Sequence, residues 1–185
     1  MTPYIIIGLG NPGKAYEKTR HNLGFRILDA LAGQLDVEFK SKAKYSADIA
    51  EASVKGTKLI LAKPQTFMNV SGTTAQALVQ FYSAPPIQVW VVHDDVDIAF
   101  GKIKVQRDRS SAGHRGVQDI IERLGTQDFN RIRVGVDSRT EEQKKNIETD
   151  DYVLAKFTKD EEKKLDSLIP EIVERILKEV SRLPS

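Results

Sequence analysis

Hydrophobic residues along the chain follow two different spacings. Short apolar and β-branched runs, each closed by turn-prone or charged residues, predict strands at residues 4–9, 58–62, 87–92, 103–106 and 132–136. Apolar residues at helical spacing predict helices at about 22–35, 69–82, 116–124 and 159–182. Pro170 falls inside the last helix and should kink or divide it. Because strands and helices alternate, we expect an α/β fold with helices on both faces of a twisted sheet.

One segment departs from this alternation. In residues 42–61, Lys55 and Gly56 stand between two apolar stretches, which is typical of a β-hairpin and makes the sheet mixed rather than wholly parallel. No repeat or low-complexity linker divides the 185 residues, and a chain of this length buries about 70% of its unfolded surface as one domain. We therefore expect a single domain over residues 1–185 with a mixed sheet.

Composition excludes several kinds of chemistry. The chain contains no cysteine, so disulfides, thiolate catalysis and cysteine-based zinc sites are excluded, and a reducing cytosol is compatible with it. We find no signal peptide or membrane span, because the first apolar run is too short and lacks a basic leader. The sequence reads as that of a cytoplasmic protein with no membrane attachment.

Charge is balanced in total but uneven along the chain. The net charge is +2, from 28 basic and 26 acidic side chains. Basic residues nevertheless gather in two stretches, which are Arg107, Arg109, Arg115, Arg123, Arg131, Arg133 and Arg139, and then Lys40, Lys42 and Lys44. Each stretch is either a solvated face or a phosphate-contacting surface, and charge alone does not choose between them.

The first strand leads into the string GLGNPG, in which Gly8, Gly10 and Gly13 match a dinucleotide fingerprint. In a true fingerprint the third glycine opens a helix whose amides hold a pyrophosphate. Here the first amphipathic helix begins only near Asn22, and residues 11–13 have the composition of a tight turn. A dinucleotide site is therefore disfavoured.

The same segment carries two groups suited to a different chemistry. Asn11 follows a strand end, where binding groups of open α/β sheets gather, and His21 precedes a helix. The positive end of the helix dipole favours the neutral imidazole, which is the form that accepts a proton. His21 is thus a candidate general base.

A cluster of His93, Asp94, Asp95 and Asp97 follows the predicted strand at residues 87–92. It is compatible with a hard metal ion, or with a single carboxylate, Asp94, that accepts the second N–H of the base histidine. Two further residues, His114 and Asn69, fall at loop-to-helix junctions, so all three histidines point to a shared cleft. With no cysteine and no G-x-S-x-G elbow, the chemistry left is water activated by a base.

Several separated strings together resemble a known family. GLGNPG, Y-x-x-T-R-H-N, K-P-x-T-[FY]-M-N-x-S-G, H-D-D-x-D and G-H-x-G occur in this order, and the chain closely resembles bacterial-type peptidyl-tRNA hydrolase from about residue 4 to about residue 158. The resemblance implies a monomeric, cofactor-free and metal-independent esterase of the cytoplasm. Such an enzyme cleaves the ester between a nascent peptide and tRNA, which recycles prematurely released peptidyl-tRNA in translation and ribosome rescue.

The resemblance also implies roles for individual residues. His21 would activate water, Asp94 would orient it, and Asn11 and Asn69 would hydrogen-bond the peptide or the reacting carbonyl. Met68 and Phe67 would line the adjoining pocket, although core packing is the alternative for both and the favoured one for Phe67. The remaining substrate or tRNA contacts would be Tyr16 beside the tRNA 3′ end, His114 and Arg115 in the G-H-x-G string, Arg133 on the 5′-terminal phosphate and Arg107 in place of a basic companion near Gln106. Residues 141–151 would form a lid, and the C-terminal helix at 159–182 would add tRNA contacts.

One departure from the family pattern lies inside this site. The family reads G-G-x-x-G-H-N-G where this chain has residues 109–116 as R-S-S-A-G-H-R-G, so Arg115 replaces an asparagine and Ser110 and Ser111 stand in a glycine-rich loop. Arginine donates hydrogen bonds but accepts none, and serine tolerates positive φ poorly. Two alternatives stay open: a non-catalytic RNA-binding relative of the same fold, and a metal-dependent hydrolase that uses His93 and the aspartate cluster.

Overall fold

The sheet at the centre of the molecule is mixed. The computed structural model describes residues 2–182, and its seven strands pair in the order β2-β3-β4-β1-β5-β7-β6. β1, β4, β5 and β7 run parallel, whereas β3 and β6 run antiparallel to the strands beside them. The strands are β1 (Tyr4–Gly8), β2 (Lys40–Lys42), β3 (Ala47–Val54), β4 (Thr57–Pro64), β5 (Val89–Ala99), β6 (Ile103–Arg107) and β7 (Asn130–Asp137).

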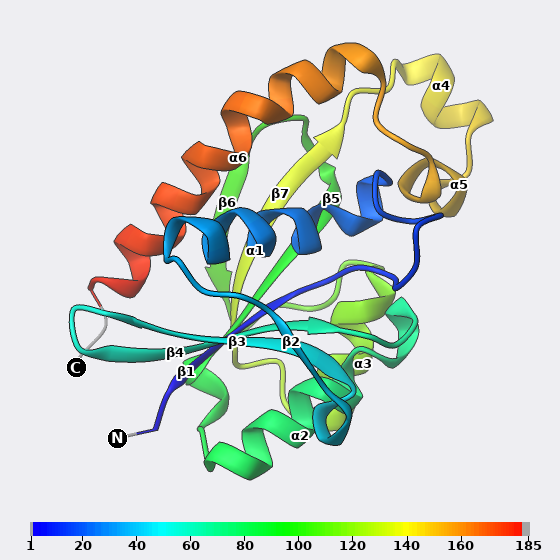
Figure 1. Ribbon diagram of the computed structural model, residues 1–185. Helices are drawn as coiled ribbons and strands as arrows, with labels where there is room; N and C mark the ends of the chain where they lie inside the picture. Colours follow the sequence, from blue (N-terminus) through cyan, green and yellow to red (C-terminus); the bar gives the residue numbers. More distant parts are fainter. Residues whose placement is uncertain (1, 183–185) are drawn as a thin grey trace.

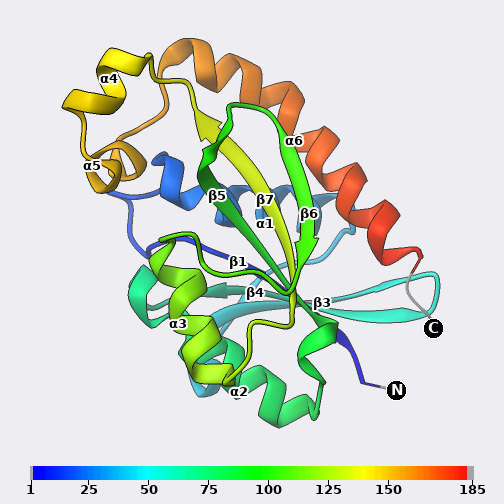
Figure 2. The same cartoon turned by 180° about the vertical axis from the view of Figure 1, so that it is seen from behind.

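Helices cover both faces of this sheet (Figures 1 and 2). α1 (Leu23–Gln34) and α6 (Lys159–Val180) pack on one face, and α2 (Gly72–Tyr82) and α3 (Arg115–Leu124) pack on the other. Successive residues of β1 serve the two cores in turn, because side chains alternate across a strand: Ile6 faces α1 and α6, while Ile5 and Ile7 face α2 and α3. The expected α/β architecture, one domain with helices on both faces of a mixed sheet, is confirmed.

Shorter elements complete the chain. α4 (Glu141–Asn146) and α5 (Thr149–Leu154) follow β7 and stand near the amino end of α1 (Figure 1). Single 3-10 turns occur at η1 (Arg20–Asn22), η2 (Ala43–Tyr45), η3 (Met68–Val70) and η4 (Pro86–Gln88). No helix within residues 2–182 combines the length and the apolar character needed to cross a membrane.

The predicted hairpin forms between β3 and β4. Val54 pairs with Thr57, and Lys55 and Gly56 between them have φ angles of 50° and 85°. Positive φ at both central residues is the signature of the tight turn that matches the twist of two antiparallel strands. A short edge strand that was not predicted, β2, extends this side of the sheet with exposed lysines, which discourage pairing with another sheet edge.

β5 is longer than the sequence predicts. The expected end at Val92 is wrong, because the strand continues to Ala99 through His93 and the aspartates. His93, Asp94 and Asp95 stay in register with residues 133–135 of β7, and the register shifts only between Asp95 and Ala99. Because β5 pairs with the buried strand β7, it continues through these polar residues. Asp94 therefore lies within the strand rather than just past it.

α6 runs without interruption across Pro170, so of the two predicted outcomes, a kink or a division, the division is wrong. Proline inside a helix removes one hydrogen bond and costs about 3 kcal/mol. Here Pro170 is exposed, while the buried stripe of α6, including Leu165, Ile172 and Ile176, packs into the core it shares with α1. Burial of that stripe outweighs the local penalty, because helix stability in proteins comes mainly from packing of the apolar face.

Two glycines let α1 sit directly on the sheet. A Cβ atom added at Gly24 would lie 2.4 Å from the Leu9 backbone nitrogen and 2.5 Å from the Val92 carbonyl oxygen. A Cβ at Gly8 would lie 2.5 Å from the Gly24 carbonyl oxygen. This close approach holds the amino end of α1, and the η1 turn that precedes it, against the ends of β1 and β5.

Candidate active site

One carboxylate joins two histidines at the carboxyl end of the central strands. His21 Nδ1 lies 3.0 Å from both Asp94 Oδ1 and Asp94 Oδ2, and His114 Nε2 lies 3.1 Å from Asp94 Oδ1. The centroids of the two imidazole rings are 4.8 Å apart, and the Asp94 side chain is only 2% exposed. The structure thus brings His21, Asp94 and His114 into one hydrogen-bonded group.

Three different elements place these side chains. His21 belongs to η1, immediately before α1, Asp94 lies within β5, and His114 is the N-cap of α3. His114 Nδ1 accepts a hydrogen bond from the Val117 backbone N–H at 3.3 Å, so its Nε2 carries the proton that it donates to Asp94. His21 likewise donates from Nδ1, which leaves its Nε2 on the opposite side of the ring as a proton acceptor.

Asp94 and His21 each shift the pKa of the other toward the charged form. Burial favours the neutral carboxyl of Asp94, but the charges and hydrogen bonds of His21 and His114 outweigh it and hold the pKa of Asp94 well below its usual range. Burial lowers the pKa of His21, yet the charge and hydrogen bond of Asp94 leave that pKa raised above 6.5. The expectation that His21 would favour its neutral form is therefore wrong in its net direction, because the neighbouring carboxylates together outweigh burial.

His93 does not join the aspartates in a metal site. Its Nδ1 lies 2.6 Å from the Asp94 carbonyl oxygen, its ring packs against His114, and burial lowers its pKa to about 3. Asp95 instead pairs with Arg133 at 2.6 Å. The arrangement expected for a His93–aspartate metal centre is absent from residues 2–182, where the three side chains placed closely enough to share an ion are His21, Asp94 and His114.

Asn11 is held by its backbone and by its side-chain oxygen. Its N–H donates to Asn22 Oδ1 at 2.8 Å, its carbonyl accepts from Asn22 Nδ2 at 2.8 Å, and its Oδ1 accepts from the Met68 N–H at 2.7 Å. These contacts leave the Asn11 NH2 group for the cavity that Asn11 lines. The sequence reading missed Asn22, although it is part of the T-R-H-N string and is 2% exposed.

Two cavities meet at His21. The first, of about 350 Å³, has a lining that includes the polar residues Asp95, Asp97, Ser111 and Thr149. The second, of about 240 Å³, is lined by Asn11, Phe67, Met68, Asn69 and Leu154. His21, Arg115, Asp150 and Val153 line both. One cavity is thus rich in carboxylates and hydroxyls, whereas the other combines side-chain amides with apolar groups.

The residues expected beside the cleft differ in exposure. Phe67 is 61% exposed at the rim of the second cavity, so core packing, the favoured alternative for this residue, is wrong. Met68 is buried and still contributes to the lining of that cavity. Asn69 is exposed and lines the same cavity. The K-P-x-T-F-M-N-x-S-G string therefore forms one wall of the second cavity.

Three residues with expected tRNA contacts lie outside both cavities. Tyr16 is half-buried in the turn before η1. Arg133 is 13% exposed and is held by Asp95 and Gln106. Arg107 donates to both oxygens of Asp128, at 2.5 and 2.8 Å, and pairs across the ladder with Asn130 at the amino end of β7. These side chains belong to the outer surface or to the sheet rather than to the cleft.

The loop before α3 forms without the glycines of the family pattern. Positive φ falls on Ala112, at 49°, and on Gly113, at 83°, and not on Ser110 or Ser111. The two serines therefore impose no strain of the kind expected from the sequence. Arg115, the first residue of α3, extends across the cleft to Asp150 of α5, which the sequence reading did not single out.

Known proteins resemble this chain in sequence and in fold. A family model described as peptidyl-tRNA hydrolase matches residues 5–182. A peptidyl-tRNA hydrolase of Caldanaerobacter subterraneus subsp. tengcongensis is 42% identical over 174 residues, which cover 94% of this chain and 91% of that relative. One of Lactiplantibacillus plantarum is 43% identical over 162 residues, covering 88% and 84%. The crystal structure of peptidyl-tRNA hydrolase from Acinetobacter baumannii has a TM-score of 0.83 at 29% identity, covering 97% of this chain and 87% of that one.

Proposed function

This chain belongs to the peptidyl-tRNA hydrolase family, and on that premise we propose that it hydrolyses the ester bond between peptide and tRNA in peptidyl-tRNA, with His21 as general base. The observation that carries the proposal is the Asp94 carboxylate, which accepts N–H groups from His21 and His114 beside two cavities. A carboxylate behind an imidazole fixes its tautomer and stabilises the imidazolium that forms during catalysis.

The first step is the attack of water on the ester carbonyl. A water molecule at His21 Nε2 gives its proton to that nitrogen as its oxygen bonds to the carbonyl carbon. The charge of the resulting imidazolium is balanced by Asp94, 3.0 Å from Nδ1. Negative charge develops on the former carbonyl oxygen, where the amides of Asn11 and Asn69 donate hydrogen bonds worth about 2–4 kcal/mol.

The second step releases both products. The tetrahedral intermediate collapses, the bond between the carbonyl carbon and the ribose oxygen breaks, and the ribose oxygen takes the proton from His21 Nε2. The products are a peptide with a free carboxyl group and a deacylated tRNA, and His21 returns to its neutral form. His21 carries the proton in both steps and the amides of Asn11 and Asn69 stabilise the oxyanion, so no step in this proposal requires a metal ion and we expect metal chelators to leave the rate unchanged.

The two cavities suit the two halves of this substrate. The second cavity offers the amides of Asn11 and Asn69 and the apolar Phe67, Met68 and Leu154, which match a peptide backbone and its side chains. The first cavity offers hydroxyl and carboxylate groups, which match the hydroxyls of the terminal ribose. The ester then lies at His21, where the cavities meet.

The outer contacts belong to the tRNA, which is far larger than the cleft. In this proposal Tyr16 stacks on the terminal adenine, Arg133 and Arg107 meet phosphates near the 5′ end, and α6 adds contacts of its own. Arg133 and Arg107 must then exchange their present partners, Asp95 and Asp128, for phosphate. Residues 141–151 act as a lid, and the enzyme works as a cytoplasmic monomer.

The test is the hydrolysis of N-acetyl-phenylalanyl-tRNA, with free phenylalanyl-tRNA as the unblocked comparison. The wild type should cleave the blocked ester with and without a chelator, and His21→Ala should lower the rate by about 10²- to 10⁴-fold, the usual contribution of a general base. Cleavage that survives His21→Ala would remove the base assignment. An inactive wild type that gains activity as Arg115→Asn would instead identify a non-catalytic RNA-binding relative.

A further inference from the structure

An ion pair crosses the cleft where its two cavities meet. Arg115, at the start of α3, donates from Nη2 to Asp150 Oδ2 on α5, and the two side chains are 67% and 60% exposed. Both residues line both cavities, as does His21. An ester held at His21 with its peptide in one cavity and its nucleotide in the other therefore has to pass this pair.

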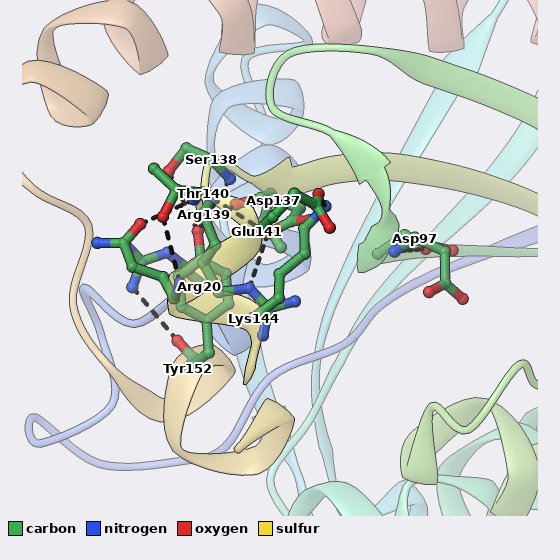
Figure 3. Close-up of polar contacts among 12 residues, drawn as sticks. Arg20, Asp97, Asp137, Ser138, Arg139, Thr140, Glu141, Lys144 and Tyr152 are labelled. Atoms are coloured by element: carbon green, nitrogen blue, oxygen red, sulfur yellow. Dashed lines mark hydrogen bonds and ion pairs between the residues drawn. The ribbon is translucent and has the colours of Figure 1, made fainter. Parts of the chain in front are cut away.

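The two ends of the 140–155 segment are anchored much more firmly than Asp150 is. Arg20, which is 4% exposed, pairs with Glu161 at 2.8 Å and donates to the Tyr152 and Lys156 carbonyl oxygens at 3.3 and 3.1 Å. The Tyr152 ring contacts two cations, because the guanidinium carbons of Arg20 and Arg139 lie 4.1 and 4.3 Å from its centroid. Figure 3 shows these three side chains grouped together. These contacts with Arg20 and Arg139 hold the carboxyl end of α5 in place.

The other end of the segment is fixed in the same region. The Thr140 side chain and Gln143 cap α4 reciprocally, and Lys144 reaches Asp137 at the end of β7 (Figure 3). Asp150 lies between these anchors, and its exposed ion pair with Arg115 joins α5 to α3. Exposed pairs of this kind contribute only about 0–1 kcal/mol, so a competing charge separates them easily.

Arg115 is the residue of the first cavity that is best suited to bind an anion. Among the described residues that line it, Arg115 is the sole permanent cation, against the carboxylates of Asp94, Asp95, Asp97 and Asp150. Asp94 is already bonded to two histidines and Asp95 to Arg133, so Asp150 is the carboxylate that occupies the Arg115 guanidinium. A phosphodiester offers the same planar fork two oxygens and a full negative charge.

We propose that Arg115 is a specificity-determining residue that exchanges Asp150 for a phosphodiester of the tRNA 3′ end when the substrate binds. This inference rests on the proposed function, because it takes the ester to lie at His21. Asp150 is then an internal competitor of the tRNA, and removing its charge should tighten binding. Removing the Arg115 charge should weaken binding, although both changes break the same ion pair.

The experiment compares Asp150→Asn, Arg115→Asn and Arg123→Asn. Arg123 is on the same helix and pairs with Asp119, but it lies outside both cavities, so it controls for loss of a positive charge on α3. KM is measured with N-acetyl-phenylalanyl-tRNA and with the N-acetyl-phenylalanyl ester of adenosine, which has no phosphate. Kd for deacylated tRNA is measured alongside, since it does not depend on turnover.

For the tRNA ester we expect Asp150→Asn to lower KM by about two- to five-fold and Arg115→Asn to raise it by about ten-fold, with Kd for deacylated tRNA moving in the same directions. For the adenosine ester, which has no phosphate, the two variants should have similar KM values. If both variants lower KM and Kd for tRNA, the ion pair only obstructs tRNA binding and the proposed exchange is wrong. If Arg115→Asn changes KM and Kd no more than Arg123→Asn does, the proposed exchange is also wrong. Failure of the wild type to cleave either ester would overturn the proposed function, and the Kd series would still decide the exchange.

Discussion

At the scale of single residues, Asp94 organises the site by accepting two N–H groups at once. His21 and His114 approach the same carboxylate, at 3.0 and 3.1 Å, so the tautomers of both rings are set by one buried charge. The sequence predicts a carboxylate behind His21 and favours Asp94 for it. It does not predict that His114 shares the carboxylate, because that contact depends on how the N-cap of α3 meets β5.

His93 leads to a prediction about stability in mild acid. Its pKa is lowered to about 3 by burial, so the folded protein keeps it neutral at a pH where the unfolded chain, with an ordinary histidine, is protonated. The unfolded state then binds more protons, and this group makes the free energy of unfolding fall by up to about 1.4 kcal/mol per pH unit below 6.5. Urea unfolding at pH 6 and pH 5 measures the effect.

The matched variant for this measurement is His93→Asn, whose amide can still donate to the Asp94 carbonyl oxygen but does not titrate. The loss of stability between pH 6 and pH 5 should be smaller in the variant than in the wild type. Equal losses in the two proteins would show that His93 is not the group responsible.

Several residues that shape the site could not be found from the sequence. Arg20 and Asn22 flank His21 in the T-R-H-N string, yet their buried positions depend on partners elsewhere: Glu161 for Arg20 and the Asn11 backbone for Asn22. A polar side chain reads as a surface residue until the fold supplies a partner that is distant in sequence. The surroundings of Arg115 were missed for the same reason, since Asp150 is 35 residues away.

At the scale of elements, the position of α1 on the sheet sets the position of His21. Gly24→Ala would press a methyl group against the Leu9 and Val92 backbone, where the nearest atoms are 2.4 and 2.5 Å from the new Cβ. We expect the free energy of unfolding to fall by about 1–3 kcal/mol and the hydrolysis rate to fall with it, because the helix must move and carries η1 along. Urea unfolding and the rate of ester cleavage measure the two effects.

Gly33→Ala is the control within the same helix. Nothing lies within 4 Å of a Cβ added there, so alanine should raise the free energy of unfolding by about 0.5–1 kcal/mol and leave the rate unchanged. A Gly24→Ala variant as stable and as active as Gly33→Ala would contradict the view that close packing of α1 on the sheet positions His21.

Elements with strong local signals were predictable, and those decided by distant packing were not. The β3–β4 hairpin follows from the turn chemistry of Lys55 and Gly56, and the start of α1 was placed within about one residue of its observed Leu23. The extension of β5 depends on pairing with β7, and the continuity of α6 across Pro170 depends on core burial. The family resemblance predicts a lid at 141–151 but does not predict that this segment forms α4 and α5.

At the scale of the whole molecule, the site lies where the carboxyl ends of parallel strands meet helix starts from both layers. η1 brings His21 from the α1 side, and the N-cap of α3 brings His114 from the other side, with β5 between them. This is the general location of ligand sites in open α/β sheets, and it explains why residues from five separated motifs converge. The same layering leaves the basic residues Arg107 and Arg133 outside the cleft, where only a substrate much larger than the cleft would reach them.

In the proposed mechanism His21 acts as the base and Asp94 keeps its pKa raised. Both roles can be checked by the pH dependence of kcat/KM for N-acetyl-phenylalanyl-tRNA in the wild type and in Asp94→Asn. The base must be neutral and the pKa of His21 is raised, so the wild-type rate should climb with pH through a pKa above 6.5. In Asp94→Asn burial is no longer opposed by the carboxylate, so that pKa should fall while the plateau drops by about 10²- to 10⁴-fold. A folded Asp94→Asn enzyme with the wild-type pKa and the wild-type plateau would rule out the role of Asp94 behind His21.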